Sequence, residues 1–441
     1  MPRSAPTTRK SDLSEPVIIV GGGFSGAMLA ARLAEGGRAS VLIDRTGDFG
    51  PGVAYSTPFA GHLLNVRAGR MSAIEGRPDD FVDWLKAHAP DHADPQGFAP
   101  RTLYGRYVRD RLAGVETVHP GLIRRVAGEV AAVTEDGVRL TDGEAIKGAV
   151  VVLATGNPPP RTAGRDDRVL ADPWAPGALD RIGDADDILI IGSGLTMVDV
   201  VQALDARGWR GRVSTLSLRG LLPRTHGAPP DVHADLPETA TAGPLSRRLK
   251  AARTLARDAG WRAVMDGYRP ITARLWVEAT TTQRARLMHH LRPWWDVHRH
   301  RIAPEMGRML DRLSAEDRLT LKAGRLESVE AGDGKPLARW RPWRQAAAEP
   351  LTADWIIDCT GPGHDAAAHP LTGPLIAQGR ARLDPLGLGL DLDADGRVLD
   401  AQGRADGRLW TLGPPARAAY WETIAVPDIR KRIEAMAAII D

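Results

Sequence analysis

Residues 17–26 read Val-Ile-Ile-Val-Gly-Gly-Gly-Phe-Ser-Gly, and this stretch decides the fold. The four apolar residues predict a strand that is buried on both faces, as in the middle of a parallel sheet. Gly21, Gly23 and Gly26 form the G-x-G-x-x-G pattern, a helical pattern follows it, and Asp44 ends the next strand. Together these features make the dinucleotide-binding fingerprint, with a tight turn at Gly21, backbone approach to a pyrophosphate at Gly23 and close helix packing at Gly26.

The N-terminal position of this fingerprint, and the motifs that follow it, favour FAD as the dinucleotide. The helix that begins at Phe24 and Ser25 would turn its free N–H groups towards the phosphates. Asp44 would accept hydrogen bonds from the adenosine ribose, with Arg45 beside it. A strand over 126–133, which contains Val130, is placed to lie along the adenine.

Two strand ends with small residues are expected to lie close to the cofactor. The strand over 150–153 runs into Ala154-Thr155-Gly156, where the chain could pass near a ligand, and an ordinary strand-end turn is the alternative. The strand over 355–357 leads in a similar way to Gly361. These turns are therefore predicted to line the cofactor site.

The C-terminal segment returns the chain to the same site. A strand ends at Gly413, and a helix is predicted to start near Ala425, with Thr423 and Ala425 among the residues expected at the cofactor. The N-terminus of that helix would point at the flavin N1–C2=O edge and stabilise the anionic reduced ring. A plain packing helix is the alternative.

A second glycine turn follows the apolar strand 188–191. Met197 stands where this second fingerprint usually has a small residue, and no acidic residue ends the next strand, 213–216. Ser217 and Arg219 would bind a 2′-phosphate that a carboxylate would repel, which predicts NADPH rather than NADH; a solvated surface arginine is the alternative for Arg219. The other residues expected to hold the nucleotide are Gly192, Ser193, Gly194, Leu195 and Thr196.

These elements predict an α/β fold with two Rossmann-like dinucleotide-binding domains and a helical insertion. The FAD domain is expected at 15–160 and 355–441, after a disordered tail at 1–14. The NAD(P)H domain is expected at 161–354, with the insertion at about 244–313.

Composition excludes several classes of protein. The 441 residues include 58 basic and 55 acidic ones, a balance that does not favour nucleic acid. Cys359 is the only cysteine, so a disulfide or a catalytic dithiol within the chain is excluded. Without an apolar run of membrane-spanning length or a secretory signal pattern, we expect a cytoplasmic protein that does not bind membranes.

A cluster of aromatic and basic residues, 294–301, stands out in the insertion. His298 and His300 are two residues apart and cannot share a helix face, so no metal site is predicted. The cluster is either a helix end that docks on the flavin domain or a wall of the substrate cavity.

With these residues in place, the chain resembles the FAD-NAD(P)-binding family named for a urate hydroxylase-type domain. That family is distantly related to the N-hydroxylating and Baeyer–Villiger (class B) flavin monooxygenases. The resemblance implies FAD at the first glycine turn with Asn65 near the flavin, and a pyridine nucleotide at the second turn. The segments that carry it are 50–55, 62–66, 70–72, 172–174, 192–196 with Asp199, 295–301, 358–362 and 421–427.

The expected function is that of an FAD-dependent, NADPH-using oxidoreductase. The favoured form is a single-component monooxygenase that uses molecular oxygen to hydroxylate a small substrate, preferably at an amine nitrogen, through a flavin C4a-peroxide. The cofactor carries the hard chemistry, so no catalytic residue is assigned. An NAD(P)H-dependent flavin reductase or dehydrogenase, and a non-catalytic flavin redox sensor, are the alternatives.

Overall fold

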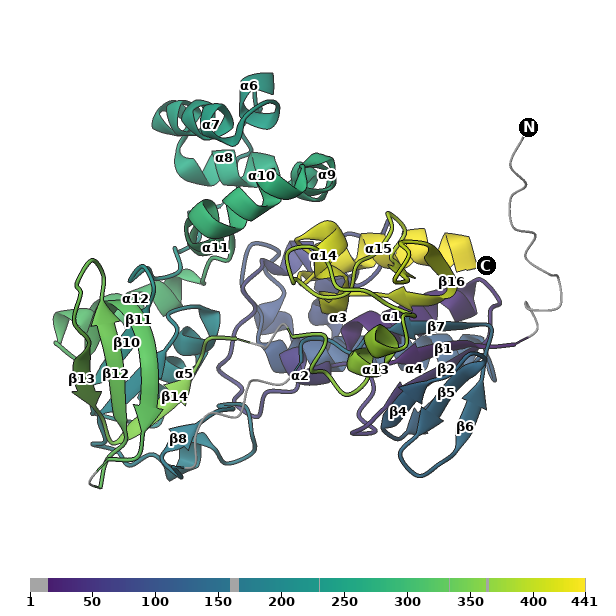
Figure 1. Ribbon diagram of the computed structural model, residues 1–441, viewed down its shortest axis with the longest axis horizontal. Coiled ribbons are helices and arrows are strands. Elements are labelled where there is room, and N and C mark those ends of the chain that lie inside the picture. The colour runs from purple at the N-terminus through teal and green to yellow at the C-terminus, as the bar shows by residue number, and fades with distance from the viewer. Residues whose placement is uncertain (1–14, 159–165, 230, 333, 362–364, 441) are drawn as a thin grey trace.

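The computed structural model describes residues 15–158, 166–229, 231–332, 334–361 and 365–440. The predicted tail at 1–14 lies outside these ranges, as do Pro159 and Pro160 at the predicted crossover between domains. The described chain forms two α/β domains, one around each glycine turn, and a group of helices that projects from them (Figure 1). The predicted fold class is confirmed.

The first domain is built on a sheet whose described strands follow the order β15-β16-β7-β1-β2-β3. All pairs except β15·β16 are parallel. The bounds are β1 Val17–Val20, β2 Ser40–Asp44, β3 Ile123–Ala127, β7 Val150–Leu153, β15 Arg397–Leu399 and β16 Ala405–Thr411.

Both faces of this sheet are covered, which explains the continuous apolar run in β1. Val17 and Ile19 pack into a core with the long helices, whereas Ile18 and Val20 face the other layer. That other layer includes a small antiparallel sheet formed by β4 Val130–Val133, β5 Gly137–Leu140 and β6 Ala145–Lys147. The helices of this domain are α1 Phe24–Glu35, α2 Gly52–Tyr55, α3 Asp80–His88, α4 Arg101–Val118, α13 Thr372–Ala377, α14 Arg417–Tyr420 and α15 Val426–Ile440.

The predicted strand over 126–133 is wrong as a single element. The chain leaves the main sheet at Ala127 and starts β4 at Val130, because Gly128 and Glu129 separate a parallel strand from an antiparallel one. Val130 therefore lies in the small sheet, where it pairs with Leu140.

The second domain has its own sheet, with the described strands in the order β13-β12-β11-β10-β9-β14-β8. Its core packs α5 Leu195–Ala206 and α12 Pro304–Ala315 on one face and the β12–β13 hairpin against the other. The bounds are β8 Val169–Leu170, β9 Ile188–Ile191, β10 Val213–Ser217, β11 Leu319–Glu330, β12 Leu337–Pro342, β13 Glu349–Thr352 and β14 Trp355–Asp358.

Two predicted boundaries differ from the structure. β14 pairs in parallel with β9, so the strand at 355–358 belongs to the second domain rather than to the predicted FAD segment 355–441. Helix α12 contributes Met309, Leu310 and Leu313 to the core of the second domain, so it is not part of the insertion.

The insertion stands above both domains in Figure 1, as a group of short helices. Its π-helical turn at Leu287–Leu291 leads directly into α11. The helices are α6 Glu238–Thr241, α7 Leu245–Ala259, α8 Trp261–Tyr268, α9 Thr272–Glu278, α10 Thr281–Arg286 and α11 Arg292–Arg299.

Candidate functional site: a cavity between two glycine turns

The first glycine turn is packed so tightly that side chains cannot fit. A Cβ atom at Gly21, whose φ is 109°, would lie 2.4 Å from the carbonyl oxygen of Ala154. A Cβ atom at Gly26 would lie 1.9 Å from the carbonyl oxygen of Gly21. Helix α1 can therefore begin directly at the end of β1 and present its N-terminal N–H groups at this edge of the sheet.

Asp44 closes the same turn from the neighbouring strand. Its carboxylate accepts hydrogen bonds from the backbone N–H of Gly22 at 2.8 Å and from the hydroxyl of Thr46 at 2.6 Å. Arg45 follows it and is exposed. The position of Asp44 at the carboxyl end of β2 is the one from which an acidic residue binds a ribose.

The second glycine turn repeats this geometry. A Cβ atom at Gly192, with φ 103°, would lie 2.4 Å from the carbonyl oxygen of Cys359. Around Gly194, in contrast, no atom of the described residues lies within 4 Å of a Cβ position, apart from its chain neighbours. The second turn is therefore open where the first is filled.

The predicted phosphate-binding residues lie at the end of β10. The hydroxyls of Ser193 and Ser217 are 2.8 Å apart, which joins the glycine turn to that strand. The guanidinium of Arg219 lies over the indole of Trp343, 3.9 Å from the ring centroid. Arg219 is thus held by stacking beside Ser217, rather than extending freely into solvent.

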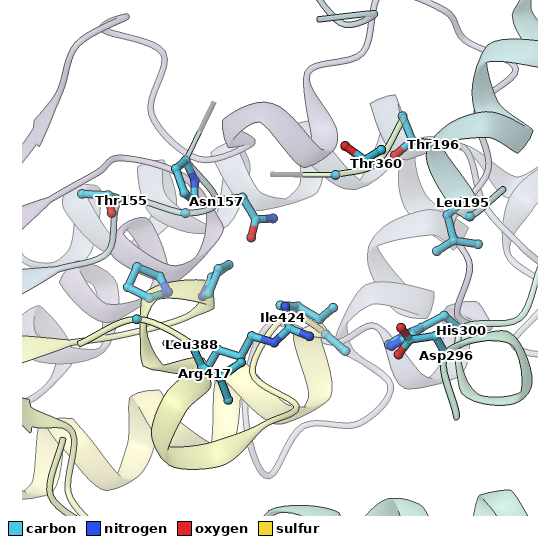
Figure 2. A pocket seen from close by; sticks show the side chains of 18 of the residues that line it. Thr155, Asn157, Leu195, Thr196, Asp296, His300, Thr360, Leu388, Arg417 and Ile424 are labelled. Atoms are coloured by element: carbon cyan, nitrogen blue, oxygen red, sulfur yellow. The ribbon is translucent and has the colours of Figure 1, made fainter. Parts of the chain in front are cut away.

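Between the two turns lies a cavity of about 440 Å³ (Figure 2). It brings together segments of both domains and of the insertion. The predicted residues that line it are Asn65, Thr155, Gly156, Gly194, Leu195, Thr196, Gly361 and Ala425. Of the remaining predicted residues, all of them described, none lines the cavity: Gly21, Gly23, Phe24, Ser25, Gly26, Asp44, Arg45, Val130, Ala154, Gly192, Ser193, Ser217, Arg219, Gly413 and Thr423.

The C-terminal segment closes the cavity on the side of the first domain. A Cβ atom at Gly413 would lie 2.5 Å from the hydroxyl oxygen of Ser25, and the buried hydroxyl of Thr423 donates to the carbonyl oxygen of Gly413 at 3.0 Å. Helix α15 then begins at Val426, next to Ala425, and both residues line the cavity. The predicted helix N-terminus therefore lies at the wall of the cavity.

Helix α11 closes the opposite side, where the 294–301 cluster both contacts the first domain and lines the cavity. Trp295 donates from Nε1 to Glu422 at 2.9 Å, and Arg299 donates from Nε to the other Glu422 oxygen at 2.8 Å. The same helix lines the cavity with Asp296, Arg299 and the adjoining His300. The insertion thus docks on the first domain and forms a wall of the cavity.

Burial shifts the protonation of several cavity groups. It raises the pKa of the Cys359 thiol well above its usual range and lowers the pKa of His300. Cys359 is therefore a neutral thiol and His300 a neutral imidazole near pH 7. Burial, followed by repulsion from Arg292, lowers the pKa of Arg417 to about 10, which leaves this arginine charged.

Sequence patterns did not indicate Arg417 or Arg292 as site residues. Arg417 follows the Pro-Pro turn after Gly413, and Arg292 begins α11. For Arg417 the available signal was a basic residue four positions after Gly413, at the start of α14.

The described part of the chain holds no cluster of His, Cys, Asp or Glu suited to a metal ion. Among the same residues, no helix combines the length and the apolar character needed to cross a membrane.

Comparisons with known proteins agree with this geometry. Residues 18–158 match the FAD-NAD(P)-binding family, so the first glycine turn belongs to an FAD-NAD(P)-binding domain, as the sequence predicted. A comparison with curated protein sequences finds no match.

Solved structures extend the similarity of fold to nearly the whole chain. Ornithine hydroxylase (PvdA) from Pseudomonas aeruginosa aligns with a TM-score of 0.65 and 16% identity, over 97% of this chain and 98% of that one. Ornithine N-hydroxylase KtzI from Kutzneria sp. 744, with reduced FAD, NADP⁺ and L-ornithine, gives 0.63 and 17%, over 97% and 98%. The cadaverine monooxygenase DfoA from Erwinia amylovora, bound to FAD, gives 0.67 and 13%, over 97% and 94%. At these identities the similarity establishes the fold.

Proposed function

We propose that this chain is a single-component, FAD-dependent and NADPH-using monooxygenase that hydroxylates a small substrate, with an amine nitrogen as the favoured acceptor. The observation that carries the proposal is the cavity, which is lined by the ends of both glycine-turn units and by an insertion that closes it. When bound, FAD supplies the redox chemistry, accepting a hydride from the nicotinamide and activating molecular oxygen. The favoured acceptor is suggested by the ornithine and cadaverine substrates in the names of the structural neighbours.

The residues of the first domain fit FAD. Gly23 and the start of α1 would hold the pyrophosphate on backbone N–H groups, and Asp44 would hold the ribose. Gly156 has φ 71° and, among the described residues, no close contact around its Cβ position, so the backbone is open to a ligand there. The N-terminus of α15 would stabilise negative charge on the flavin from the opposite side.

The residues of the second domain fit a nucleotide with a 2′-phosphate. The turn at Gly192–Gly194 would hold the pyrophosphate, and its open side at Gly194 faces the cavity. Ser217 and the stacked guanidinium of Arg219 would bind the 2′-phosphate. A nucleotide bound in this way would extend along the cavity towards the first domain.

The chain also shapes the space in which a substrate would react and excludes water from it. The salt bridge from Arg299 to Glu422, both less than a tenth exposed, keeps α11 against the first domain. Apolar side chains of Val297, Leu388 and Ile424 line this part of the cavity. Their role is to position the substrate and exclude water, so the chemistry requires no general base from the protein.

A dithiol reductase route is excluded, since Cys359 is the sole cysteine. A reductase without oxygen insertion and a redox sensor could be built on the same fold, because a fold does not by itself define the chemistry. They differ from the proposed function in what happens after flavin reduction.

The test is an anaerobic titration of the purified holoprotein with NADPH and, separately, with NADH. We expect the flavin absorbance near about 450 nm to bleach with NADPH and much less with NADH. Air is then admitted with and without candidate amines, while NADPH consumption, hydrogen peroxide and hydroxylated product are measured. Product formation that depends on the amine supports the monooxygenase. Bleaching with peroxide alone supports the reductase, and failure of both nucleotides to bleach the flavin would overturn the proposal.

A further inference from the structure

Helix α5 follows the second glycine turn directly, and one of its faces is bonded to the first domain. Figure 1 shows α5 on the side of the second domain that faces the first. The side chain of Gln202 donates from Nε2 to the carbonyl oxygen of Gly61 at 2.7 Å. About one turn earlier, the backbone oxygen of Asp199 lies 3.0 Å from Nε2 of His62, and the Asp199 carboxylate is bound to Arg101. These bonds join α5 to two segments of the first domain.

The contact between Asp199 and Arg101 is a fork with two parallel bonds. Nη1 of Arg101 lies 2.8 Å from one carboxylate oxygen of Asp199, and Nη2 donates to the other at 3.0 Å. The two side chains are 16% and 10% exposed, so the pair is largely sheltered from water. Burial raises the pKa of Asp199, and the charge of Arg101 opposes this shift. A fork of this kind restricts the orientation of the two side chains as well as the distance between them.

The segment of the first domain that receives α5 is itself held in place. The backbone N–H of Arg101 donates to the carbonyl oxygen of His62 at 2.8 Å, and its Nε donates to that of Leu63 at 2.9 Å. The second ring nitrogen of His62, Nδ1, lies 2.7 Å from the hydroxyl of Thr57. Since His62 is only 3% exposed, these bonds are protected from competition by water. The first domain therefore offers α5 a bonded surface with a defined geometry.

Both partners of this contact continue directly into the cavity. Leu195 and Thr196, about one turn before Asp199, line it from the second domain. Asn65 and Val66, which follow the segment that receives α5, line it from the first domain. The contact therefore couples the start of α5, where a nucleotide pyrophosphate would be held, to the residues expected near the flavin.

A sheltered ion pair of this kind is weak evidence for stability, because the desolvation of two charges offsets much of their attraction. We propose that Asp199 is a positioning residue whose fork with Arg101 sets the orientation of the second glycine turn relative to the flavin. The proposal rests on the function proposed above and adds a residue to it. In the step concerned, a hydride with its two electrons passes from the reduced nicotinamide to the oxidised flavin, which leaves NADP⁺ and reduced flavin. The reacting atoms must lie about 3–3.5 Å apart, so a small rotation of the second domain would slow the transfer.

Anaerobic stopped-flow reduction of the flavin by NADPH tests the proposal, because its dependence on NADPH concentration gives the limiting rate and the Kd separately. Asp199→Asn keeps the shape of the side chain and removes its charge. We expect the limiting rate to fall about tenfold to a hundredfold while the Kd changes less than about twofold, because the turn still holds the nucleotide and only its orientation to the flavin changes. Arg101→Lys, which keeps a charge and loses the fork, should give a smaller loss of the same kind.

Asp205→Asn is the matched control. Asp205 lies on the same helix, but its partner is Arg312 on α12, so its ion pair at 2.6 Å stays within the second domain. The limiting rate should be unchanged in this variant. Flavin content and circular dichroism establish that each variant is folded, and Arg101→Lys carries the test if Asp199→Asn does not fold. A weaker affinity for NADPH with an unchanged limiting rate, or equal limiting rates in all the proteins, would overturn the proposal.

A distance measurement distinguishes a failure of this proposal from a failure of the proposed function. Thr117→Cys on α4 and Ser314→Cys on α12 place nitroxide labels at exposed positions of the two domains, while Cys359 is buried and stays unlabelled. Electron paramagnetic resonance of the oxidised protein without nucleotide should give one narrow distance, and a broader or displaced distribution once Asp199→Asn is added. An unchanged distribution would contradict a role of Asp199 in domain orientation. If NADPH does not reduce the wild-type flavin, the proposed function fails, and the distance distribution still decides whether Asp199 sets the orientation.

Discussion

The two glycine turns of this molecule are built on one plan. In each, the backbone N–H of the first glycine donates to the next strand, β2 or β10, at 2.8 Å. The residue that follows the strand on the other side, β7 or β14, donates to the last residue of β1 or β9 at 2.7–2.8 Å. The register places Asp44 and Ser217 at equivalent positions, one residue beyond the last residue that β2 pairs with β1 and that β10 pairs with β9. The equivalent bonds are Gly21 to Ile43, Gly192 to Leu216, Ala154 to Val20 and Cys359 to Ile191.

The differences lie in what surrounds each turn. The Cβ position of Gly23 faces Gly52 at 3.3 Å, whereas that of Gly194 is open within the described chain. At the third fingerprint position the first turn has Gly26, and the second has Met197, which is fully buried in the core. An enclosed turn suits a cofactor that stays bound, and an open turn suits a nucleotide that enters and leaves.

The largest expected effect comes from closing the tighter turn. In Gly26→Ala, the new methyl group would meet the carbonyl oxygen of Gly21 at 1.9 Å, and a backbone atom cannot rotate away. We expect the free energy of unfolding to fall by about 4 kcal/mol, above the usual cost of overpacking, with loss of bound FAD.

The control for this substitution is Gly114→Ala on the exposed face of α4, where, apart from its own helix, the described chain offers no atom within 4 Å of the new Cβ. It should stabilise the protein by up to about 1 kcal/mol, since alanine favours helix. Denaturant unfolding and the flavin-to-protein ratio are the measurements. Retention of FAD and stability by Gly26→Ala would show that the first turn is not the tighter one.

The next effect concerns the contact between the two units. His226, beyond β10, lies with Nε2 3.1 Å from the carbonyl oxygen of Asn65 in the first domain, and burial lowers its pKa from 6.5 to about 4. Between these pH values the unfolded chain binds a proton that the native chain does not, so stability falls as the pH falls from 6.5 to 4. The loss should approach about 3 kcal/mol, and above pH 6.5 this group adds no further dependence.

His226→Gln keeps a donor for Asn65 and should flatten that part of the stability profile. The measurement is the free energy of unfolding by denaturant between pH 4 and 6.5, for the wild type and for His226→Gln. The difference between the two pH profiles is the contribution of His226. His62→Gln is a second arm, since burial also lowers the pKa of His62, whose Nε2 lies 3.0 Å from the backbone oxygen of Asp199 in the second domain. If the wild type and His226→Gln show the same dependence of stability on pH, the protonation of His226 does not control stability in this range.

Local patterns in the sequence were sufficient to predict both turns. Gly21 and Gly192 needed only the preceding apolar strand and the following helix to be recognised, because strand, turn and helix are consecutive in the sequence. The closest contacts of these glycines, with Ala154 and Cys359, are distant in the sequence and were not needed to find the turns. The start of α15 near Ala425 was also predicted closely from a local pattern.

What failed depends on pairing over long distances. The apolar strand 355–358 suits either parallel sheet, and only its pairing with β9 assigns it to the second domain. Glu422 meets Trp295 across 127 residues, a contact that no local pattern encodes. Arg417 lines the cavity together with residues of α11, and these two segments are also far apart in the sequence.

A smaller effect should follow from filling the open turn. In Gly194→Ala, the backbone at φ −87° and ψ −161° accepts alanine, and the described chain leaves room for the methyl group. We expect stability and FAD content to be unchanged, and the KM for NADPH to rise about thirtyfold, or about 2 kcal/mol, because the methyl group occupies the approach to the pyrophosphate. The matched change Gly23→Ala should instead reduce FAD content. Equal KM values for wild type and Gly194→Ala would place the nucleotide elsewhere.

The smallest expected effect tests the position at which the first unit has the carboxylate of Asp44 and the second has the hydroxyl of Ser217. Ser217→Asp gives the second turn the carboxylate that Asp44 gives the first, near the hydroxyl of Ser193. A carboxylate there would repel a 2′-phosphate and could bind a ribose hydroxyl, so the KM for NADPH should rise about tenfold while that for NADH falls. Arg219→Gln should raise the KM for NADPH without improving NADH, because it removes a cation and adds no ribose partner. If both substitutions leave the ratio of the two KM values unchanged, the end of β10 does not read the 2′-phosphate, and the stack of Arg219 on Trp343 serves only to hold the β12–β13 hairpin in place.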